Sequence, residues 1–180
     1  MNNVGISFPD CTSAGEFNVW GNSFSGDFLP QGGEVTVHGV PFDFPRGQCG
    51  NPDNVRCTGQ YIDVEPGRYD WIYFLAAAER RAEDEVALHF SDGQVDFEAL
   101  RVSDFWNAPA AFGEHRAFAS PVMHYPHHVQ SGLAAVLWQQ RVPVTRRGIL
   151  TGVRLPRNIS IHIFAATLRA TQDLEQEDYS

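Results

Sequence analysis

Apolar and polar residues alternate along most of the chain, in short runs that end at Gly, Pro, Asn or Asp. A period of two is typical of β-strands, whose successive side chains point to opposite faces of a sheet. Residues 34–44 show this pattern on either side of a His-Gly-Val-Pro segment, and residues 85–102 show it on either side of Asp92-Gly93. Asp-Gly is a strong signal for a tight turn, so both stretches predict antiparallel hairpins.

A different pattern marks residues 69–79, YDWIYFLAAAE, which form a nearly continuous apolar run. Such a run predicts a central strand that is covered on both faces. Towards the C-terminus, the segments AVLWQQRVPV, GILTGVRLP and ISIHIFAATLRA predict further strands. Short helical pieces are expected near residue 25 and in residues 76–84, where the end of a strand and a loop fit the sequence equally well.

Roughly ten short strands, spaced by turn signals and without a strand–helix–strand rhythm, predict an all-β fold. The expected architecture is an antiparallel β-sandwich with one or two short helices. At 180 residues, one domain is the default. We therefore expect a single β-sandwich domain over residues 1–170, followed by a disordered acidic tail at residues 171–180.

The chain carries a net charge of −9, and all 13 of its basic residues are arginines scattered along the sequence. A nucleic-acid backbone requires clustered positive charge, so we expect no nucleic-acid partner. The absence of lysine excludes Schiff-base chemistry and a P-loop. No run approaches the ~18 apolar residues of a membrane span, and the first residues lack the features of a secretory signal. We expect a cytoplasmic protein with no membrane partner.

Cys11, Cys49 and Cys57 lack the paired spacing of zinc and redox sites. The loop between Cys49 and Cys57 is long enough for a disulfide. In a cytoplasmic protein, however, free thiols are the expectation.

Three stretches, in the same order along the chain, carry a family resemblance. They are GNPDNVRCTGQYIDV, VALHFSDG with LRVSDFWN, and VRLPRNISIHIFAATL. Together they resemble a β-sandwich accessory domain of bacterial, especially actinobacterial, glycoside hydrolases, and the resemblance covers about residues 15–169. It implies a galactose-binding-like jelly roll that binds carbohydrate. Such a fold sometimes holds a structural calcium ion, to which Asp10, Asp43 or Asp53 could contribute oxygen ligands.

The segment MHYPHH, residues 123–128, is the densest group of histidines and is expected to be a loop at one end of the sandwich. Three interpretations stay open. His124, His127 and His128 could bind a metal, with His115 as a further ligand, although a Pro-containing loop does not place them on one side. His124 and His128 could act as acid and base with Tyr125 as a hydrogen-bond donor. The third interpretation is a solvated polar loop.

Sugar recognition requires flat aromatic faces flanked by polar side chains that hydrogen-bond hydroxyl groups. Trp20 lies beside Asn18 and Asn22 in a polar segment, and Trp106 lies beside Asp104 and Asn107. The candidate ligand-binding residues are therefore Trp20, Asn22, Trp106, Asn107 and Phe112. Trp71 and Trp138, by contrast, stand within apolar strands and are expected in the core.

Two functions from different classes follow. The first is a binding domain for a carbohydrate or polyol. The alternative is a small biosynthetic enzyme of the cyclase or isomerase type, with Asp104, His124 and His128 as acid/base residues, Tyr125 as donor, and Trp20, Trp106 and Phe112 as walls. An enclosed apolar cavity of ~300 Å³ or more would favour the enzyme, and an open groove with an exposed tryptophan would favour binding. The expected partner is a small molecule or carbohydrate, and a free sheet edge leaves a homodimer open.

Overall fold

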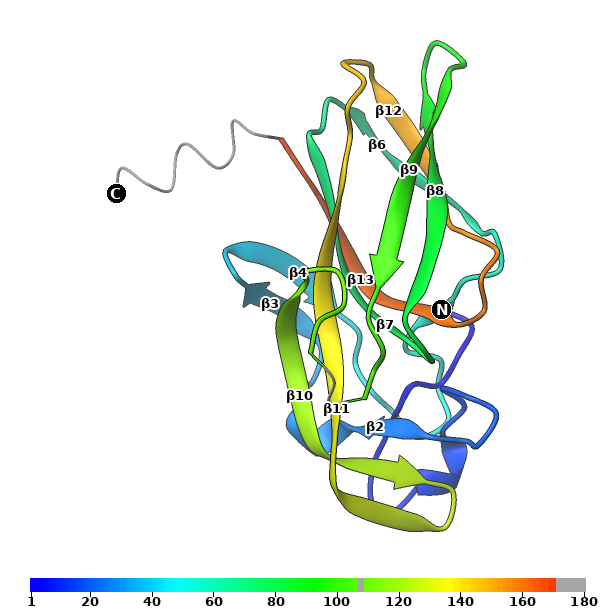
Figure 1. Cartoon of the computed structure of the whole chain (residues 1–180), viewed down its shortest axis with the longest axis vertical. Helices are drawn as coiled ribbons and strands as arrows, with labels where there is room; N and C mark the ends of the chain where they lie inside the picture. The colour runs from blue at the N-terminus through cyan, green and yellow to red at the C-terminus, as the bar shows by residue number, and fades with distance from the viewer. Residues whose placement is uncertain (107–108, 171–180) are drawn as a thin grey trace.

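The computed structural model describes residues 1–106 and 109–170 of the chain, so Asn107 and the expected tail at 171–180 lie outside the described residues. The fold is all-β, as predicted (Figure 1). A seven-stranded sheet has the order β1 (Ile6–Ser7), β2 (Ser23–Ser25), β10 (His115–Tyr125), β11 (His128–Pro143), β7 (Trp71–Ala78), β13 (Ile161–Arg169) and β5 (Val55–Arg56). A four-stranded sheet has the order β6 (Tyr61–Gly67), β12 (Leu150–Arg154), β8 (Ala82–Phe90) and β9 (Val95–Val102). Strands β3 (Gly33–Val37) and β4 (Val40–Phe44) form a separate hairpin.

Strand β7 is buried on both faces, which explains its continuous apolar sequence. One set of alternating side chains, including Ile72 and Phe74, packs in a core shared with the four-stranded sheet. The other set, including Tyr73 and Leu75, packs in a second core that holds the β3–β4 hairpin and two phenylalanines from loops, Phe17 and Phe105. The seven-stranded sheet is therefore the middle of three layers.

The expected helix near residue 25 is present as the short 3₁₀ helix η2 (Gly26–Phe28), and another, η1, spans Thr12–Ala14. The helix considered for residues 76–84 is not formed. Residues there belong to the end of β7 and the start of β8, because alanines on both faces of β7 are fully enclosed between the packed layers.

Both predicted hairpins are present, as β3–β4 and β8–β9. At the β3–β4 tip, Val37 pairs with Val40, and His38 and Gly39 adopt positive φ angles of 46° and 75°. Two consecutive left-handed residues give the turn twist that suits a two-residue hairpin. Side chains of the large sheet fix this tip: Gln139 Nε2 donates to Val37 O at 3.0 Å and an Arg169 nitrogen donates to Gly39 O at 2.7 Å. A hairpin that would be marginal alone is thereby anchored.

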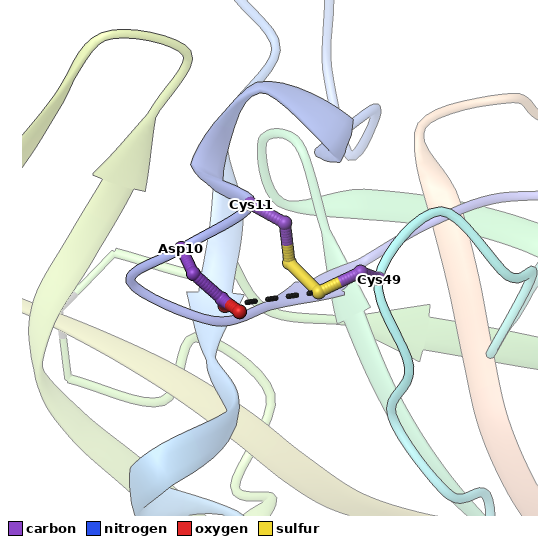
Figure 2. A group of neighbouring side chains, drawn as sticks. All are labelled: Asp10, Cys11 and Cys49. Carbon is purple, nitrogen blue, oxygen red and sulfur yellow. Dashed lines mark hydrogen bonds between the residues drawn. A yellow bond between two sulfur atoms is a disulfide. The ribbon is translucent and has the colours of Figure 1, made fainter.

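A disulfide joins Cys11 to Cys49 (Figure 2). Cys57 is a free, buried thiol. The expectation that these thiols are free is thus wrong for Cys11 and Cys49, and the pairing of Cys49 with Cys57 is not formed. Cys57 is enclosed in the core between the two large sheets, and burial raises the pKa of its thiol to about 12. Sequence spacing could not show that the loops around residues 11 and 49 meet.

Reduction of this disulfide is expected to lower the free energy of unfolding by about 2–4 kcal/mol, because the bond closes a long loop in the unfolded chain. For a domain of this size, that corresponds to a fall in Tm of about 5–15 °C. Thermal unfolding with and without dithiothreitol measures the effect. A Cys11→Ser/Cys49→Ser variant is the control, since its Tm should be low and insensitive to the reductant. An unchanged wild-type Tm after complete reduction would contradict the expectation.

Candidate functional site

The loop between η1 and β2 borders an open groove of about 420 Å³, which we call the loop-end groove. It is lined by Gly15, Glu16, Asn18, Val19, Gly21 and Arg56. Trp20 stands between two of the lining residues and is 64% exposed. A large aromatic residue this exposed, next to charged and amide side chains, is the arrangement that sugar recognition requires.

The loop beside the groove is held by its own hydrogen bonds. Asn18 Oδ1 accepts from the backbone N–H groups of Trp20 at 3.1 Å and Asn22 at 3.2 Å. The N–H of Gly21 donates to Asn18 O at 2.9 Å, and Gly21 has a φ of 67° that favours glycine. The turn therefore directs Trp20 outward by its backbone geometry, and little ordering is left to occur on binding.

Gly15 brings this loop close to β2. A Cβ atom at Gly15 would lie 2.5 Å from Ser23 Oγ and 2.9 Å from Gly21 O, so no larger residue fits without moving the backbone. The floor of the groove is thus shaped by a close approach that only glycine permits.

Arg56, on the edge strand β5, supplies the guanidinium of the groove. One of its nitrogens donates to Phe17 O at 3.1 Å and to Glu79 Oε1 at 3.1 Å. Burial opposes ionisation of Glu79, but the hydrogen bonds and charges of His162 and Arg56 outweigh it and lower the pKa of this carboxyl. The ion pair is only partly exposed, so Arg56 is held in place at the groove.

A row of buried polar side chains, His162, Asn54 and Asp53, continues from Glu79, the partner of Arg56. The His162 ring is fully enclosed and stacks on Phe17 with a centroid separation of 4.1 Å. Its Nδ1 lies 3.0 Å from Asn54 Oδ1, and its Nε2 lies 3.6 Å from Glu79 Oε1. Burial lowers the pKa of His162, against the opposing effect of Glu79, and Nδ1 donates to the amide oxygen of Asn54. This histidine is an interior residue of strand β13.

Asp53 lies at the other end of this row of buried polar side chains, next to Asn54. Its Oδ1 accepts from Gly5 N–H and from Asn54 Nδ2, and its Oδ2 accepts from Ile6 N–H, each at 2.9 Å. Burial raises the pKa of Asp53 to about 6, against the opposing effect of these N–H donors. Both carboxylate oxygens accept hydrogen bonds from the backbone of the N-terminal segment, so Asp53 is a structural residue.

The three carboxylates considered for calcium do not converge. Asp10 and Asp43 are exposed on other segments, and Asp53 is committed to N–H donors. In the part of the chain that the structure describes, the group with three potential metal ligands is Asp10, Cys11 and Cys49. Figure 2 shows that its two sulfur atoms are bonded to each other, with the Asp10 carboxylate 3.8 Å from Cys49 Sγ. Sulfur atoms in a disulfide are not thiolate ligands.

The predicted ligand-binding residues divide into two groups. Trp20 is exposed and follows Val19, which lines the loop-end groove, and Asn22 is buried, with its Nδ2 donating to His124 O at 3.4 Å. Trp106 and Phe112 do not line the groove. Trp106 packs on Phe105 with ring centroids 4.9 Å apart and is half-buried. As predicted, Trp138 is a core residue, and Trp71 is half-buried in the second core.

The residues of the MHYPHH segment do not converge either. His124 lies in β10 and is buried, with its Nδ1 2.8 Å from Ser7 Oγ, and burial lowers its pKa. Tyr125 and His128 stack at 4.7 Å where β10 turns into β11. Strand residues continue up to Tyr125, so the loop is shorter than expected.

Asp104 is not brought together with these side chains. Trp106, two residues later, pairs with Ala135, far along β11 from His128 at the β10–β11 tip. Asp104 Oδ1 accepts from Trp106 N–H at 3.1 Å, and burial raises the pKa of the Asp104 carboxyl. The acid/base set proposed from the sequence is therefore spread along the sheet.

Sequence reasoning did not single out Glu16, Arg56 or Glu79, which shape the groove. One available signal was the run Asp53-Asn54-Val55-Arg56, in which three polar residues surround one apolar residue. In the folded protein, Asp53 and Asn54 are buried polar residues, and Arg56 lines the groove.

No helix of the described chain is long and apolar enough to cross a membrane. A search of the curated proteins finds no match to the sequence. A family model described as an AziU2-like β-sandwich domain matches residues 1–172. The match supports the β-sandwich part of the resemblance seen in the sequence, and it does not extend to glycoside hydrolases. Because it spans nearly the whole chain and agrees with the three-layered all-β fold, the protein belongs to the AziU2-like β-sandwich domain family.

Proposed function

We propose that this protein binds a carbohydrate or polyol at the loop-end groove. The observation that carries the proposal is the exposed Trp20, held by a hydrogen-bonded turn beside an open groove. The indole face would stack on the C–H groups of a sugar ring. Arg56, Glu16 and Asn18 would hydrogen-bond its hydroxyls.

The arrangement of charge in the groove suits a neutral hydroxylated ligand. Arg56 contributes donors and Glu16 contributes acceptors, and hydroxyl groups satisfy both kinds of partner. Arg56 is also fixed by Glu79 and by the Phe17 carbonyl, so its donors are oriented before the ligand arrives. Fixed donors lower the entropic cost of binding.

Binding is preferred to catalysis for a geometric reason. The enzyme alternative requires Asp104, His124, Tyr125 and His128 around one apolar chamber, because acid/base groups act at hydrogen-bond distance from the reacting atoms. In the described chain, His124 bonds to Ser7 inside the protein and Asp104 lies on a different segment from the β10–β11 tip. None of these four residues lines the loop-end groove or a second hollow that lies next to His38 and Tyr73.

The test is retention by immobilised polysaccharides, with xylan, β-glucan and galactan as probes and free monosaccharides as competitors. Trp20→Ala is expected to weaken retention by about 10-fold, since aromatic stacking contributes about 0.5–1.5 kcal/mol beyond the area it buries and about 1.4 kcal/mol is a tenfold change in affinity. Its Tm should change little because the side chain is mostly exposed.

Phe97→Ala is the matched control, because Phe97 is a 63% exposed aromatic residue on strand β9 of the other large sheet. It should leave retention unchanged. Glu16→Gln, at the groove, should weaken retention without affecting Tm. Wild-type protein that none of these polysaccharides retains, or a Trp20→Ala variant retained as well as wild type, would refute the proposal.

A further inference from the structure

A second hollow, distinct from the loop-end groove, opens beneath the tip of the β3–β4 hairpin. This hairpin cleft has a volume of about 240 Å³ and is lined by His38, Tyr73, Gly113, Glu114, His115, Gln139, Gln140 and Arg141. We propose that the hairpin cleft is a binding site for a small oxyanion, either a carboxylate or a phosphate group. Its volume lies below the ~300–1,000 Å³ of pockets for drug-sized molecules, which suits a ligand of a few atoms.

Tyr73 provides a hydrogen-bond donor at the cleft. The residue is only 9% exposed, and it lies directly opposite Arg141 in the β7–β11 pairing. No hydrogen bond from its hydroxyl to any described residue is formed, and the side chain lines the cleft. The hydroxyl is therefore open to the cleft, where it can donate a hydrogen bond to an oxygen atom of a ligand.

Arg141 provides the charge. Its guanidinium lies 4.3 Å from the centroid of the Trp71 ring, which holds the side chain flat against the sheet. It forms no ion pair with a carboxylate in residues 1–106 or 109–170. A stacked guanidinium keeps its N–H groups free at the edge, where they can contact a carboxylate or phosphate in bidentate fashion.

Two imidazole rings complete the wall. His38 and His115 lie with ring centroids 4.9 Å apart, and His38 Nε2 lies 3.2 Å from Arg116 O. The carbonyl is an acceptor, so Nε2 of His38 carries the hydrogen. His38 is the non-glycine residue with a positive φ in the described chain, at the turn that sets its ring above β10.

Glu114 is the one carboxylate of the cleft, and its oxygens are already engaged. Oε1 accepts from Ser103 N–H at 2.6 Å, and Oε2 accepts from Ser103 Oγ at 2.7 Å and Phe112 N–H at 3.1 Å. These donors compensate its charge, so Glu114 orders the loop before β10 and repels a bound anion less than a free carboxylate would.

Titration of the full chain with sodium phosphate and with sodium acetate, at constant ionic strength, tests the proposal. Amide signals of Gly113 and His115 in two-dimensional NMR spectra report the position of binding. We expect saturable shifts with at least one of the two anions, and the two series distinguish a tetrahedral phosphate from a planar carboxylate. Arg141→Gln and Tyr73→Phe should each raise Kd at least ~5-fold.

Arg154→Gln is the matched control, because Arg154 is an exposed arginine that also lies over an aromatic ring, Tyr61, in the other large sheet. It should keep the wild-type Kd. So should Trp20→Ala, which separates this proposal from sugar binding at the loop-end groove. The proposal is overturned if neither anion gives saturable shifts, if Arg141→Gln binds like wild type, or if neutral glycerol competes as well as the anions do.

Discussion

Replacement of Asp53 by alanine is expected to lower the free energy of unfolding by about 3–6 kcal/mol, the largest effect that we anticipate for a single substitution in this protein. The side chain is 1% exposed and accepts from three N–H groups, two of which belong to the backbone at Gly5 and Ile6. Each buried donor left without an acceptor costs about 1–3 kcal/mol. Urea-induced unfolding, followed by fluorescence of the tryptophans, measures the loss.

Asp63→Ala is the comparison variant, because Asp63 is exposed on β6 and should be replaced at almost no cost. Equal unfolding midpoints for the two variants would contradict the structural role of Asp53. Asp53→Asn should fall between them, because the amide keeps one acceptor oxygen but places an N–H₂ group against another donor.

The ionisation of Asp53 also gives stability a specific pH dependence. Its pKa in the folded chain is about 6, above the ordinary value of 3.8, so the folded state binds the proton more tightly than the unfolded state does. The associated stability is fully present below pH ~4 and is lost as the pH rises through ~6, by on the order of 3 kcal/mol. Asp53→Asn should remove this component, which appears as a flatter curve of unfolding free energy against pH.

Replacement of Phe105 by alanine is expected to cost about 3–5 kcal/mol, because it leaves a cavity in the second core. Phe105 is 1% exposed, and its ring lies 4.8 Å from that of Phe17 and 6.4 Å from that of Phe24, centroid to centroid. These rings come from segments distant in sequence, so the cavity cannot close by a local adjustment. The Tm should fall by about 6–20 °C in a calorimetric scan.

Phe97→Ala serves as the control, since this phenylalanine is largely exposed and its removal creates no cavity. A small change in Tm for Phe105→Ala, close to that of Phe97→Ala, would mean that the second core is not packed as described. Retention on polysaccharides should persist in any Phe105→Ala protein that remains folded at the assay temperature.

The elements of the fold followed from local pattern wherever burial was one-sided or complete along a segment. The alternation in residues 34–44 and 85–102, with His38-Gly39 and Asp92-Gly93 at the turns, predicted both hairpins. The apolar run at 69–79 predicted a doubly covered strand, and β7 is buried on both faces. The pattern of residues 76–84 could not distinguish a helix from a strand, because three enclosed alanines suit a helix and a buried strand equally well.

The candidate site was only partly visible in the sequence. Trp20 stood out because a tryptophan beside two asparagines breaks the apolar pattern of a core segment. Arg56 and Glu79 did not stand out, because their importance depends on a meeting between β5 and the end of β7. The histidines of MHYPHH attracted attention by their density in sequence, yet His124 is buried in β10, whereas His127 in the turn and His128 at the start of β11 are exposed.

The sequence by itself determined the class of fold, the central strand and the turns, since periodicity and turn preference are properties of neighbouring residues. Tertiary structure alone decided that Cys11 forms a disulfide with Cys49 and that Asp53 accepts hydrogen bonds from the N-terminal backbone. It also decided that Tyr73, Arg141 and two histidines line one cleft. Each of these outcomes depends on distances between residues that are far apart in the chain. Such distances are fixed by how the sheets pack and by the register of their strands, which no local pattern encodes.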